Sequence, residues 1–589
     1  MHENLRHFIE TLRREKQIIE IEAEVDPYLE LAEIHRRVID EEGPALLFKR
    51  VKGSSFPVVT NLFGTRGRVN LAVGPRPEEI VKRAVAALNR LLPPKPSILW
   101  QEKDWILSLA KSGLRTINSK NAPVLEIKSS SIDLNTLPVL TSWPEDGGPF
   151  ITLPLVYTEH PVTKEHNLGM YRIQIYNSKQ TGIHWQIHKG GGFHYHEAER
   201  LGQDLPTTLF LGGPPALVLS AIAPLPEMLP ELIFTSFLMG EKLSKVRVPS
   251  HSHALIAEAE FAICGTVPAH VRKPEGPFGD HYGYYSLTHD FPVFNIHAVY
   301  HRRDAIYPAT VVGKPRQEDY FIGEYLQSLL SPMFPVVMPG VKALWTYAET
   351  GFHALAAAIV RESYHREALA HAFRILGEGQ LTLTKFLIIT DVQLDLQDFR
   401  TLLEKVLERF EPESDLLILN DTSMDTLDYT GRHLNHGSKA IMLGLGSPKR
   451  ELPRQIDNVI LPGILGIKPF CAGCLLIEAP SFSNTPELAQ EVLGHLQNEV
   501  LNNWPLAILV DDLELASETS GFLWQVFTRF DPAHDIYAHT EILNHRLVYR
   551  GPILIDARMK PGYPGEVVPD EATVKLVDRR WKEYGIKIG

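Results

Sequence analysis

The sequence has few cysteines, no long apolar run and no surplus of basic residues. Three cysteines, Cys264, Cys471 and Cys474, are too few for a disulfide framework, which fits a reducing compartment. No stretch of about 18 consecutive apolar residues occurs, so we expect no membrane-spanning segment. The formal net charge of −12 argues against a nucleic-acid-binding protein, which usually carries a basic stripe. A soluble, cytoplasmic protein with at most peripheral membrane contact is the expectation.

Two local patterns could mislead. Cys471 and Cys474 form one Cys-x-x-Cys pattern, "CAGC", but a four-cysteine zinc site needs a second pair. Ordinary packing is therefore favoured over metal or redox chemistry. Residues 1–26 have the pattern of a charged amphipathic helix followed by a strand, which is not typical of a signal peptide.

The length of 589 residues exceeds a single hydrophobic core and predicts roughly three to four domains. Residues 1–115 mix helical periodicity with short strands and predict a small α/β domain. Residues 116–318 contain short alternating runs between Gly/Pro turns, such as "APVLEIK" and "LGMYRIQIY", which predict an antiparallel sheet or barrel. Residues 319–450 return to an α/β pattern.

The last third of the chain contains an internal repeat. Residues 388–415 align without a gap to residues 508–535, at a constant offset of 120. The matching pairs include Asp391/Asp511, Leu403/Leu523, Val406/Val526, Arg409/Arg529, Phe410/Phe530, Pro412/Pro532 and Asp415/Asp535. We therefore predict that residues 451–560 duplicate the preceding α/β domain, followed by a helical tail at 561–589. Such an insert could cap a sheet edge or enlarge an oligomer interface.

Most chemistry-bearing residues lie in the predicted barrel. Asn167, Tyr171 and Arg172 stand close together at a strand entry, and His188 precedes Lys189 and a run of three glycines. A glycine-rich loop beside a lysine can bind phosphate through backbone N–H groups, although such loops are more often simple turns. Asn167, His188 and Glu231 together would form a mixed oxygen and nitrogen site suited to Mn²⁺ or Mg²⁺. The alternative for Glu231 is a surface acid in the first turn of a helix.

The stretch "EGPFGD" places Glu275 and Asp280 on either side of a turn. Two acids near one arginine can divide their roles: one stays charged in an ion pair, and the other, in an apolar pocket, has a raised pKa and transfers a proton. The alternative is a surface turn whose acids are solvated.

Taken in order, these motifs resemble those of the UbiD family of decarboxylases. The resembling stretches are "NLGMYR" (167–172), "HWQIHKGG" (184–191), "LPELIFTSFLMG" (229–240), "PEGPFGDHYGYY" (274–285), "HRRDAIYPAT" (302–311) and "TKF" (384–386). The resemblance implies a mixed α/β, multidomain fold with an N-terminal α/β domain, a central split β-barrel that binds flavin, and a C-terminal α/β dimerisation domain.

The resemblance also implies the cofactors and the residues that bind them. Members use prenylated FMN, supplied by a partner flavin prenyltransferase, with a divalent metal, usually Mn²⁺, and a potassium ion. By motif position, the metal ligands would be Asn167, His188 and Glu231. The cofactor-binding set is Asn167, Met170, Tyr171, Arg172, Gln186, His188, Glu231 and Lys385. Potassium is expected near Ser220, Ala221 and Ala223, and Pro505 replaces Lys385 in the second repeat.

By the same resemblance, Arg172, Glu275 and Asp280 would form the acid–base network, with Asp280 returning the proton. The implied activity is reversible, non-oxidative decarboxylation of an aromatic or α,β-unsaturated acid through a covalent cofactor adduct, by a homodimer or higher homo-oligomer. Asp280 followed by "HYGYY" favours quinone precursors, a polyprenyl-hydroxybenzoate or a carboxylated naphthoquinol. The alternatives are decarboxylation of phenolic or acrylic acids in degradation or detoxification, an idle flavin-binding scaffold, and an oxidoreductase with ordinary FMN.

Overall fold

The computed structural model describes residues 2–91, 112–186, 189–223, 225, 230–456, 459, 461–496 and 501–587. The chain forms two compact units. Unit 1 comprises Met1–Leu329 with Gly565–Gly589, and unit 2 comprises Leu330–Pro564. The boundaries of the five segments predicted from the sequence stay predictions.

Unit 1 begins with a small mixed sheet of strand order β1-β2-β3-β17, in which β2 runs parallel to β1 and antiparallel to β3. The strands are β1 (Ile18–Val25), β2 (Ala45–Val51), β3 (Val58–Thr60) and β17 (Tyr307–Pro308), and the helices are α1 (Leu5–Arg14), α2 (Glu30–Asp40), α3 (Arg66–Val73) and α4 (Arg76–Leu91). Helix α1 begins where the Asn4 side chain accepts a hydrogen bond from the amide of His7. Its buried residues recur at the helical spacing that the sequence predicted.

The second sheet of unit 1 is large and mainly antiparallel. Its strand order is β6-β9-β10-β16-β14-β11-β7-β8, with β5 and β15 also paired to β16. Its strands are β5 (Ile127–Lys128), β6 (Phe150–Ile151), β7 (Leu155–Glu159), β8 (His166–Gly169), β9 (Ile173–Asn177), β10 (Gln180–Ile183), β11 (Leu205–Leu211), β14 (Phe261–Val267), β15 (Arg272–Glu275) and β16 (His289–His301). Between the described strands no pairing joins β6 to β8, so the order is open. The predicted mixed α/β fold is confirmed.

The strand predicted at "APVLEIK" (122–128) is largely wrong. Residues 123–125 form a 3₁₀ turn, and only the two residues of β5 pair with the sheet. Pro123 has no N–H to donate to a strand ladder, which favours the turn.

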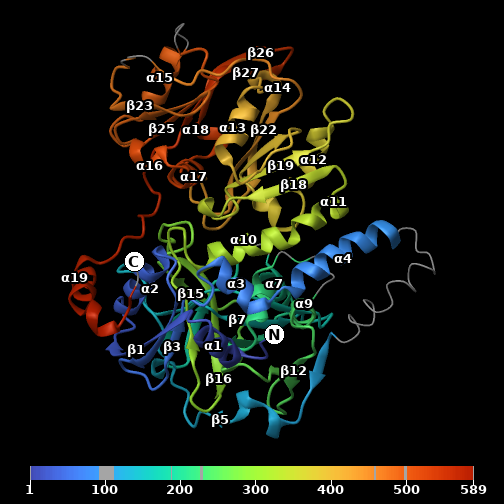
Figure 1. Cartoon of the computed structure of the whole chain (residues 1–589), viewed down its shortest axis with the longest axis vertical. Helices are drawn as coiled ribbons and strands as arrows, with labels where there is room; N and C mark the ends of the chain where they lie inside the picture. Colours follow the sequence, from blue (N-terminus) through green and yellow to red (C-terminus); the bar gives the residue numbers. More distant parts are fainter. Residues whose placement is uncertain are drawn as a thin grey trace. The chain divides into compact units, whose positions relative to one another are not determined.

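Helices and a third, three-stranded sheet (order β13-β12-β4) complete unit 1. These elements are α7 (Gly190–Arg200), α8 (Pro215–Ile222), α9 (Glu231–Met239), α10 (Glu318–Leu330), β4 (Leu114–Thr116), β12 (Leu243–Val246), β13 (Leu255–Ile256) and the tail helix α19 (Glu571–Arg580). The tail helix packs against α2, although more than 500 residues separate them in the chain (Figure 1).

Unit 2 contains two five-stranded sheets with one topology. The orders are β18-β19-β20-β22-β21 and β23-β24-β25-β27-β26, and corresponding pairs are parallel or antiparallel alike. The strands are β18 (Val341–Thr346), β19 (Leu355–Val360), β20 (Phe386–Thr390), β21 (Leu416–Ser423), β22 (His436–Gly444), β23 (Gly466–Cys471), β24 (Cys474–Glu478), β25 (Leu506–Val510), β26 (Ile536–Leu543) and β27 (Arg546–Asp556). We call the first sheet with its helices repeat A and the second repeat B.

Four elements of repeat A recur in repeat B at the offset of 120 residues. Strands β20 and β21 correspond to β25 and β26, and helices α13 and α14 to α17 and α18. The helices are α11 (Phe334–Val337), α12 (Glu367–Leu376), α13 (Phe399–Leu407), α14 (Pro412–Asp415), α15 (Leu488–Leu496), α16 (Leu513–Ser517), α17 (Thr519–Phe527) and α18 (Pro532–Asp535). The repeat found in the sequence is thus a repeat of secondary structure.

The two repeats share a core through corresponding residues. Phe386 and its counterpart Leu506 line one small apolar cavity, as do Ile388 with Ile508 and Leu416 with Ile536. The contacts are reciprocal, because α14 packs on β27 and α18 packs on β22. Figure 1 shows α13 and α18 among the strands of both sheets. Repeat B therefore covers an apolar face of repeat A inside the chain, an arrangement that approaches two-fold symmetry.

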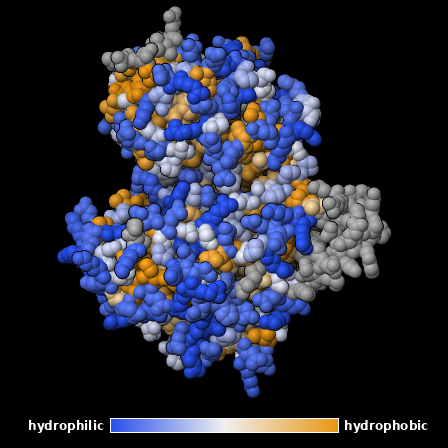
Figure 2. Space-filling view, in the orientation of Figure 1, coloured by the Kyte–Doolittle hydropathy of each residue, from blue (hydrophilic) through white to orange (hydrophobic). Residues whose placement is uncertain are grey.

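The remaining features of the fold carry little chemistry. Cys471 and Cys474 face each other across the β23–β24 turn as buried free thiols, and burial raises the pKa of Cys474 well above its usual value. No helix in the described part of the chain is both long and apolar enough to cross a membrane. The face seen in Figure 2 is mostly hydrophilic, with separate hydrophobic areas.

Candidate active site

Arg172 is the centre of a buried charged network in unit 1. It lies in the three-residue break between β8 and β9, where the chain leaves the sheet. Its guanidinium binds Glu275 through two hydrogen bonds, Nε to Oε1 and Nη2 to Oε2, both 2.8 Å long. It also binds Asp280, and its Nη2 donates to Ser286 Oγ at 2.9 Å. The side chain of Glu275 is fully buried and that of Arg172 is 7% exposed.

The loop that carries both acids is held from several sides. Glu275 ends β15, and the Asp280 amide donates to Tyr284 O at 3.0 Å, so residues 280–284 form a closed turn. The Gly276 amide donates to Gln174 Oε1 and the Gly279 amide to Asp146 Oδ1, at 2.9 and 2.8 Å. A side chain on Gly279 would overlap Trp143, which explains the glycine there. These contacts fix the positions of both carboxylates relative to Arg172.

The electrostatics of the two acids differ from the division of roles expected from the sequence. Burial alone would raise the pKa of Glu275, but Arg172 and His184 lower it to about 2. Likewise, His281 and Arg172 outweigh burial and hold the pKa of Asp280 well below its usual range. Neither acid has the raised pKa of a ready proton donor, because both contact the same guanidinium.

Two histidines border the network. His184 Nδ1 lies 3.2 Å from Glu275 Oε2, and burial together with Arg172 lowers the pKa of His184, so its ring is neutral at pH 7. Its Nε2 is buried without a hydrogen-bond partner among the described residues. His281 Nδ1 lies 2.7 Å from Asp280 Oδ1, and the His281 side chain is 23% exposed. His281 therefore connects Asp280 with solvent.

Two of the three predicted metal ligands lie close together. Glu231 is the first residue of α9, and its Oε2 accepts a hydrogen bond from the Leu168 amide at 3.3 Å. Leu168 follows Asn167 on β8, and burial raises the pKa of Glu231. His188 lies outside the described residues. A carboxylate and an amide oxygen fit a divalent metal such as Mn²⁺ or Mg²⁺. Within the described part of the chain, no group of three or more His, Cys, Asp or Glu residues is placed to hold a metal ion.

The glycine-rich run begins a helix rather than an open loop. Gly190 is the first residue of α7, and a side chain there would overlap Asn167. The hydroxyl of the buried Tyr171 accepts hydrogen bonds from the Gly191 amide at 3.2 Å and from Asn167 Nδ2 at 3.3 Å. Of this run's amides, that of Gly191 therefore already has a partner within the protein.

The other predicted cofactor residues are spread over both units. Met170 and Gln186 are partly exposed in unit 1, near the Arg172 break and after β10. Ser220 and Ala221 lie on α8 with Ala223 at its end, and Ser220 Oγ donates to Ala216 O at 2.7 Å.

Lys385 belongs to unit 2, where its Nζ lies 2.7 Å from Asp428 Oδ2 in a buried ion pair. Lys439 supports it: its Nζ donates to Thr382 O and Thr384 O at 2.8 and 2.9 Å, on the segment that leads to Lys385.

Sequence reasoning missed several residues of the network. His281 and Ser286 lie on or directly after the quoted loop and could have been found there. His184 lies in a quoted motif. Asp146 and Gln174 left no signal, because their contacts with the Asp280 loop join residues more than a hundred positions apart.

Family models match most of this chain. They are described as the N-terminal, Rift-related and C-terminal domains of 3-octaprenyl-4-hydroxybenzoate carboxy-lyase, and they match residues 9–88, 115–315 and 320–444. An uncharacterised protein of Chlamydia trachomatis is 52% identical over 99% of both chains. A Chlamydia pneumoniae protein, named as a component of 4-hydroxybenzoate decarboxylase, is 51% identical over 98% of both chains.

Solved structures share the fold. Vanillic acid decarboxylase of Sedimentibacter hydroxybenzoicus, in closed form, superposes with a TM-score of 0.67 at 23% identity, over 85% of this chain and all of that chain. The UbiD-class enzyme HmfF of Pelotomaculum thermopropionicum, in complex with FMN, superposes with a TM-score of 0.62 at 24% identity, over 78% of this chain and 98% of that chain.

Proposed function

Because this chain belongs to the UbiD family of carboxy-lyases, we propose that it decarboxylates an aromatic or α,β-unsaturated acid, non-oxidatively and reversibly. The observation that carries the proposal is the buried network in which Arg172 holds both Glu275 and Asp280. Such a network desolvates and orients reacting groups, whereas an idle scaffold has no need for three buried charges in one place.

The cofactor is prenylated FMN, bound with Mn²⁺ and K⁺ and supplied by a flavin prenyltransferase. When bound, this flavin supplies the acceptor for the electrons that CO₂ leaves behind. Asn167 and Glu231, with His188, would hold the metal. Met170, Tyr171, Arg172 and Gln186 would line the flavin, and Lys385 would meet its phosphate as a compact positive charge. The similar HmfF structures, which are complexes with FMN and with its prenylated form, support this choice of cofactor.

The proton at the reacting carbon comes from Asp280. Since Arg172 and His281 keep Asp280 ionised in the resting protein, it must gain a proton during turnover. His281 is placed to deliver it, because its Nδ1 contacts Asp280 Oδ1 while its ring reaches solvent. Arg172 and Glu275 keep the carboxylate of Asp280 in place as the proton moves.

For the substrate we propose a quinone precursor, a 4-hydroxy-3-polyprenylbenzoate or a carboxylated naphthoquinol. The description of the matched family model supports a hydroxybenzoate. The second candidate is a simple phenolic acid, which the name of the Chlamydia pneumoniae relative supports. We place the enzyme in the cytoplasm as a homodimer or higher homo-oligomer.

Repeat B, within the predicted segment 451–560, would bind no cofactor. Pro505 occupies the position of Lys385, and the strand registers place Pro552 at the position of Lys439. Both lysines of repeat A are therefore prolines in repeat B. We propose that its role is structural, as a cover for the apolar face of repeat A.

The test is co-expression with a flavin prenyltransferase, anaerobic purification, and measurement of flavin mass and metal content. Candidate acids are then incubated in D₂O, and deuterium in the product is followed by mass spectrometry. We expect prenylated FMN, manganese, and deuteration that is lost in Asp280→Asn while flavin stays bound. Plain FMN with redox activity would indicate an oxidoreductase, and a loaded protein that deuterates none of the acids would contradict the proposal.

A further inference from the structure

The C-terminal segment of the chain pairs with the loop that carries Asp280. Within unit 1, the Tyr285 amide donates to Gly565 O at 2.9 Å, and the Val567 amide donates to Gly283 O at 3.0 Å. Tyr284 and Glu566 form an antiparallel bridge between these two bonds. Residues 565–567 are thus an added strand along the second half of the turn. We call Gly565–Val567 the tail strand.

Side chains reinforce this pairing. Val567 is 7% exposed and belongs to a small buried cluster with Ala32, Trp143, Tyr285 and Val311. Trp143 is the residue that lies against Gly279, and Tyr285 belongs to the turn itself. The tail strand therefore shares one buried cluster with Trp143 and Tyr285, two aromatic side chains at the Asp280 loop.

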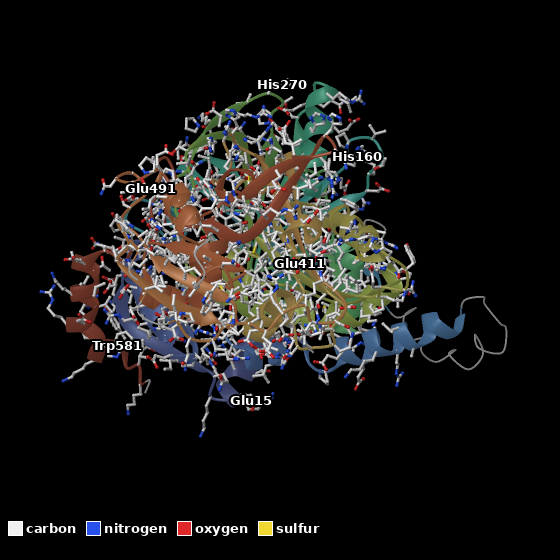
Figure 3. The ribbon with its side chains drawn as sticks, turned by 90° about the horizontal axis from the view of Figure 1, so that it is seen from above. Glu15, His160, His270, Glu411, Glu491 and Trp581 are labelled. Atoms are coloured by element: carbon white, nitrogen blue, oxygen red, sulfur yellow. The ribbon has the colours of Figure 1, made fainter. Side chains whose placement is uncertain are left out.

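The chain beyond the tail strand is firmly attached to unit 1. In the α19 region, Asp578 pairs with Arg37 at 2.7 Å, and Tyr584 OH donates to Glu30 Oε1 at 2.7 Å. Val577 is fully buried, and Trp581 lies beside the N-terminal elements (Figure 3), with the Arg37 guanidinium 5.5 Å from its ring centroid. The tail strand is thus held at its C-terminal side.

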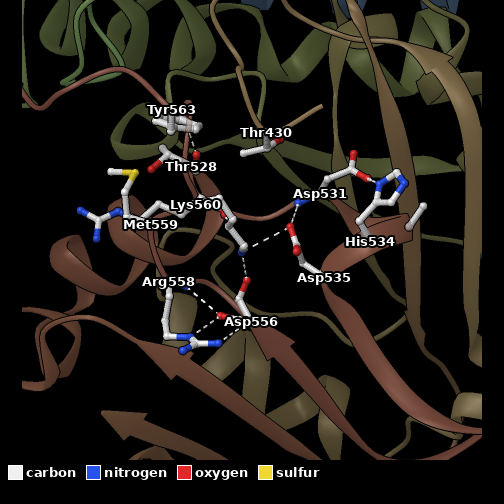
Figure 4. Close-up of polar contacts among 12 residues, drawn as sticks. Thr430, Thr528, Asp531, His534, Asp535, Asp556, Arg558, Met559, Lys560 and Tyr563 are labelled. Carbon is white, nitrogen blue, oxygen red and sulfur yellow. Dashed lines mark hydrogen bonds and ion pairs between the residues drawn. The ribbon is translucent and has the colours of Figure 1, made fainter. Parts of the chain in front are cut away.

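The chain before the tail strand is just as firmly attached to unit 2. Asp556 and Arg558 form a fully buried ion pair, and Lys560 Nζ lies 3.3 Å from Asp535 Oδ2 (Figure 4). Tyr563 OH donates to Thr528 O at 2.6 Å. Only Pro564 separates Tyr563, attached to unit 2, from Gly565, which pairs with the Asp280 loop.

We propose that the tail strand is a positioning element of the active site, which holds the Gly283–Tyr285 turn and ties its geometry to unit 2. Asp280 belongs to the same turn, because its amide and carbonyl bond Tyr284 and Gly283. A change in the attachment of residues 556–563 would therefore reach the turn through one connecting residue. The positioning role rests on the proposed function of Asp280, whereas the exchange measurements below require neither substrate nor cofactor.

The first test compares two neighbouring valines in the full-length chain. Val567→Ala removes buried methyl groups, whereas Val568→Ala changes a side chain that is 59% exposed. Hydrogen exchange of a peptide covering residues 279–286, measured by mass spectrometry, should become about tenfold faster in Val567→Ala. It should stay unchanged in Val568→Ala, and β14 should exchange at the wild-type rate in both. Val567→Pro, which also lacks the N–H donor, should accelerate the loop further, and Val567→Ile should retain wild-type exchange.

The second test addresses the tie to unit 2. Lys560→Met removes an ammonium group whose side chain is 20% exposed. Lys468→Met is the matched control, because this lysine of repeat B is 47% exposed. We expect faster exchange at residues 279–286 in Lys560→Met alone, although the substitution lies in the other unit. On loaded enzyme, kcat should fall in Val567→Ala with KM and flavin content unchanged. Unchanged loop exchange in Val567→Pro, or loosening spread evenly over unit 1, would overturn the positioning role. Unchanged loop exchange in Lys560→Met would overturn the tie.

Discussion

Replacing Arg172 by methionine tests the physical account of the active-site network. The substitution keeps an unbranched, apolar side chain but leaves Glu275, which is fully buried, and Asp280 without their cation. Removing one partner of a buried ion pair typically costs about 3–5 kcal/mol, because a charge stays buried and unpaired. We expect Arg172→Met to be destabilised by that amount at pH 7.5.

The pKa shift of Glu275 corresponds to a free energy of similar size. It falls from an ordinary 4.5 to about 2 in the folded protein. Since a tenfold change in proton affinity is worth about 1.4 kcal/mol, the network favours the charged carboxylate by roughly 3 kcal/mol. In the wild type this stabilisation is fully present above pH 4.5 and is lost as the pH falls through about 2.

In Arg172→Met the pKa shift of Glu275 reverses its sign. Burial without the guanidinium raises the folded-state pKa of Glu275 above its unfolded value, so the variant is least stable at high pH. Acidification protonates the buried carboxylate and relieves the cost. The difference from wild type should therefore shrink between pH 8 and pH 5.

The assay is hydrogen exchange of the β9 amides, which reports the opening free energy of this sheet separately from the unfolding of unit 2. Arg272→Met is the matched control. Arg272 also forms a two-bond pair, with Glu199 at 2.7 and 2.9 Å, but its side chain is 39% exposed. We expect this control to lose less than about 1 kcal/mol. Equal losses of opening free energy in the two variants would refute this account of the network. So would a loss of opening free energy in Arg172→Met that grows on acidification.

Three further predictions concern proton delivery, metal binding and the repeats. His281→Ala should lower product deuteration about a hundredfold, and added imidazole should restore it in part. The control His297→Ala, at an exposed histidine, should keep wild-type deuteration. Full activity of His281→Ala would exclude the proposed proton relay. Glu231→Ala should lose manganese and flavin, which elemental analysis and absorbance measure. The control Glu241→Ala, just beyond the end of α9, should keep both. Manganese retained in Glu231→Ala would show that Glu231 is not a metal ligand. Asp531→Ala should destabilise unit 2 by about 2–4 kcal/mol, because the buried Asp531 accepts two hydrogen bonds from Ser438 of repeat A. Pulse proteolysis measures this loss of stability. If Asp531→Ala is as stable as the control Glu541→Ala, at an exposed residue, this link between the repeats is disproved.

Much of the fold could be predicted because the local signals agree with the tertiary environment. Short strands are predicted within residues 1–115, and β2 is one of them. The helix assumed in the alternative for Glu231 is α9, which begins at that residue. The run "LGMYRIQIY", however, is not one strand. It breaks at Met170–Arg172, where the chain leaves the sheet and Arg172 turns to the buried acids. A periodic pattern cannot show such a break, since its cause lies about a hundred residues further along the chain.

The sequence by itself determined the family, the mixed α/β fold, the repeat at an offset of 120 and the residue types of the candidate site. These features are written in local order: motif spacing, apolar periodicity and turn residues. Only the tertiary structure decided that both acids share one arginine and that repeat B covers repeat A. It also decided that the pKa values of both acids are lowered, instead of one being lowered and the other raised. It alone brought the tail strand to the turn at "GDHYGYY". Burial and charge pairing join residues hundreds of positions apart, and no local pattern encodes them.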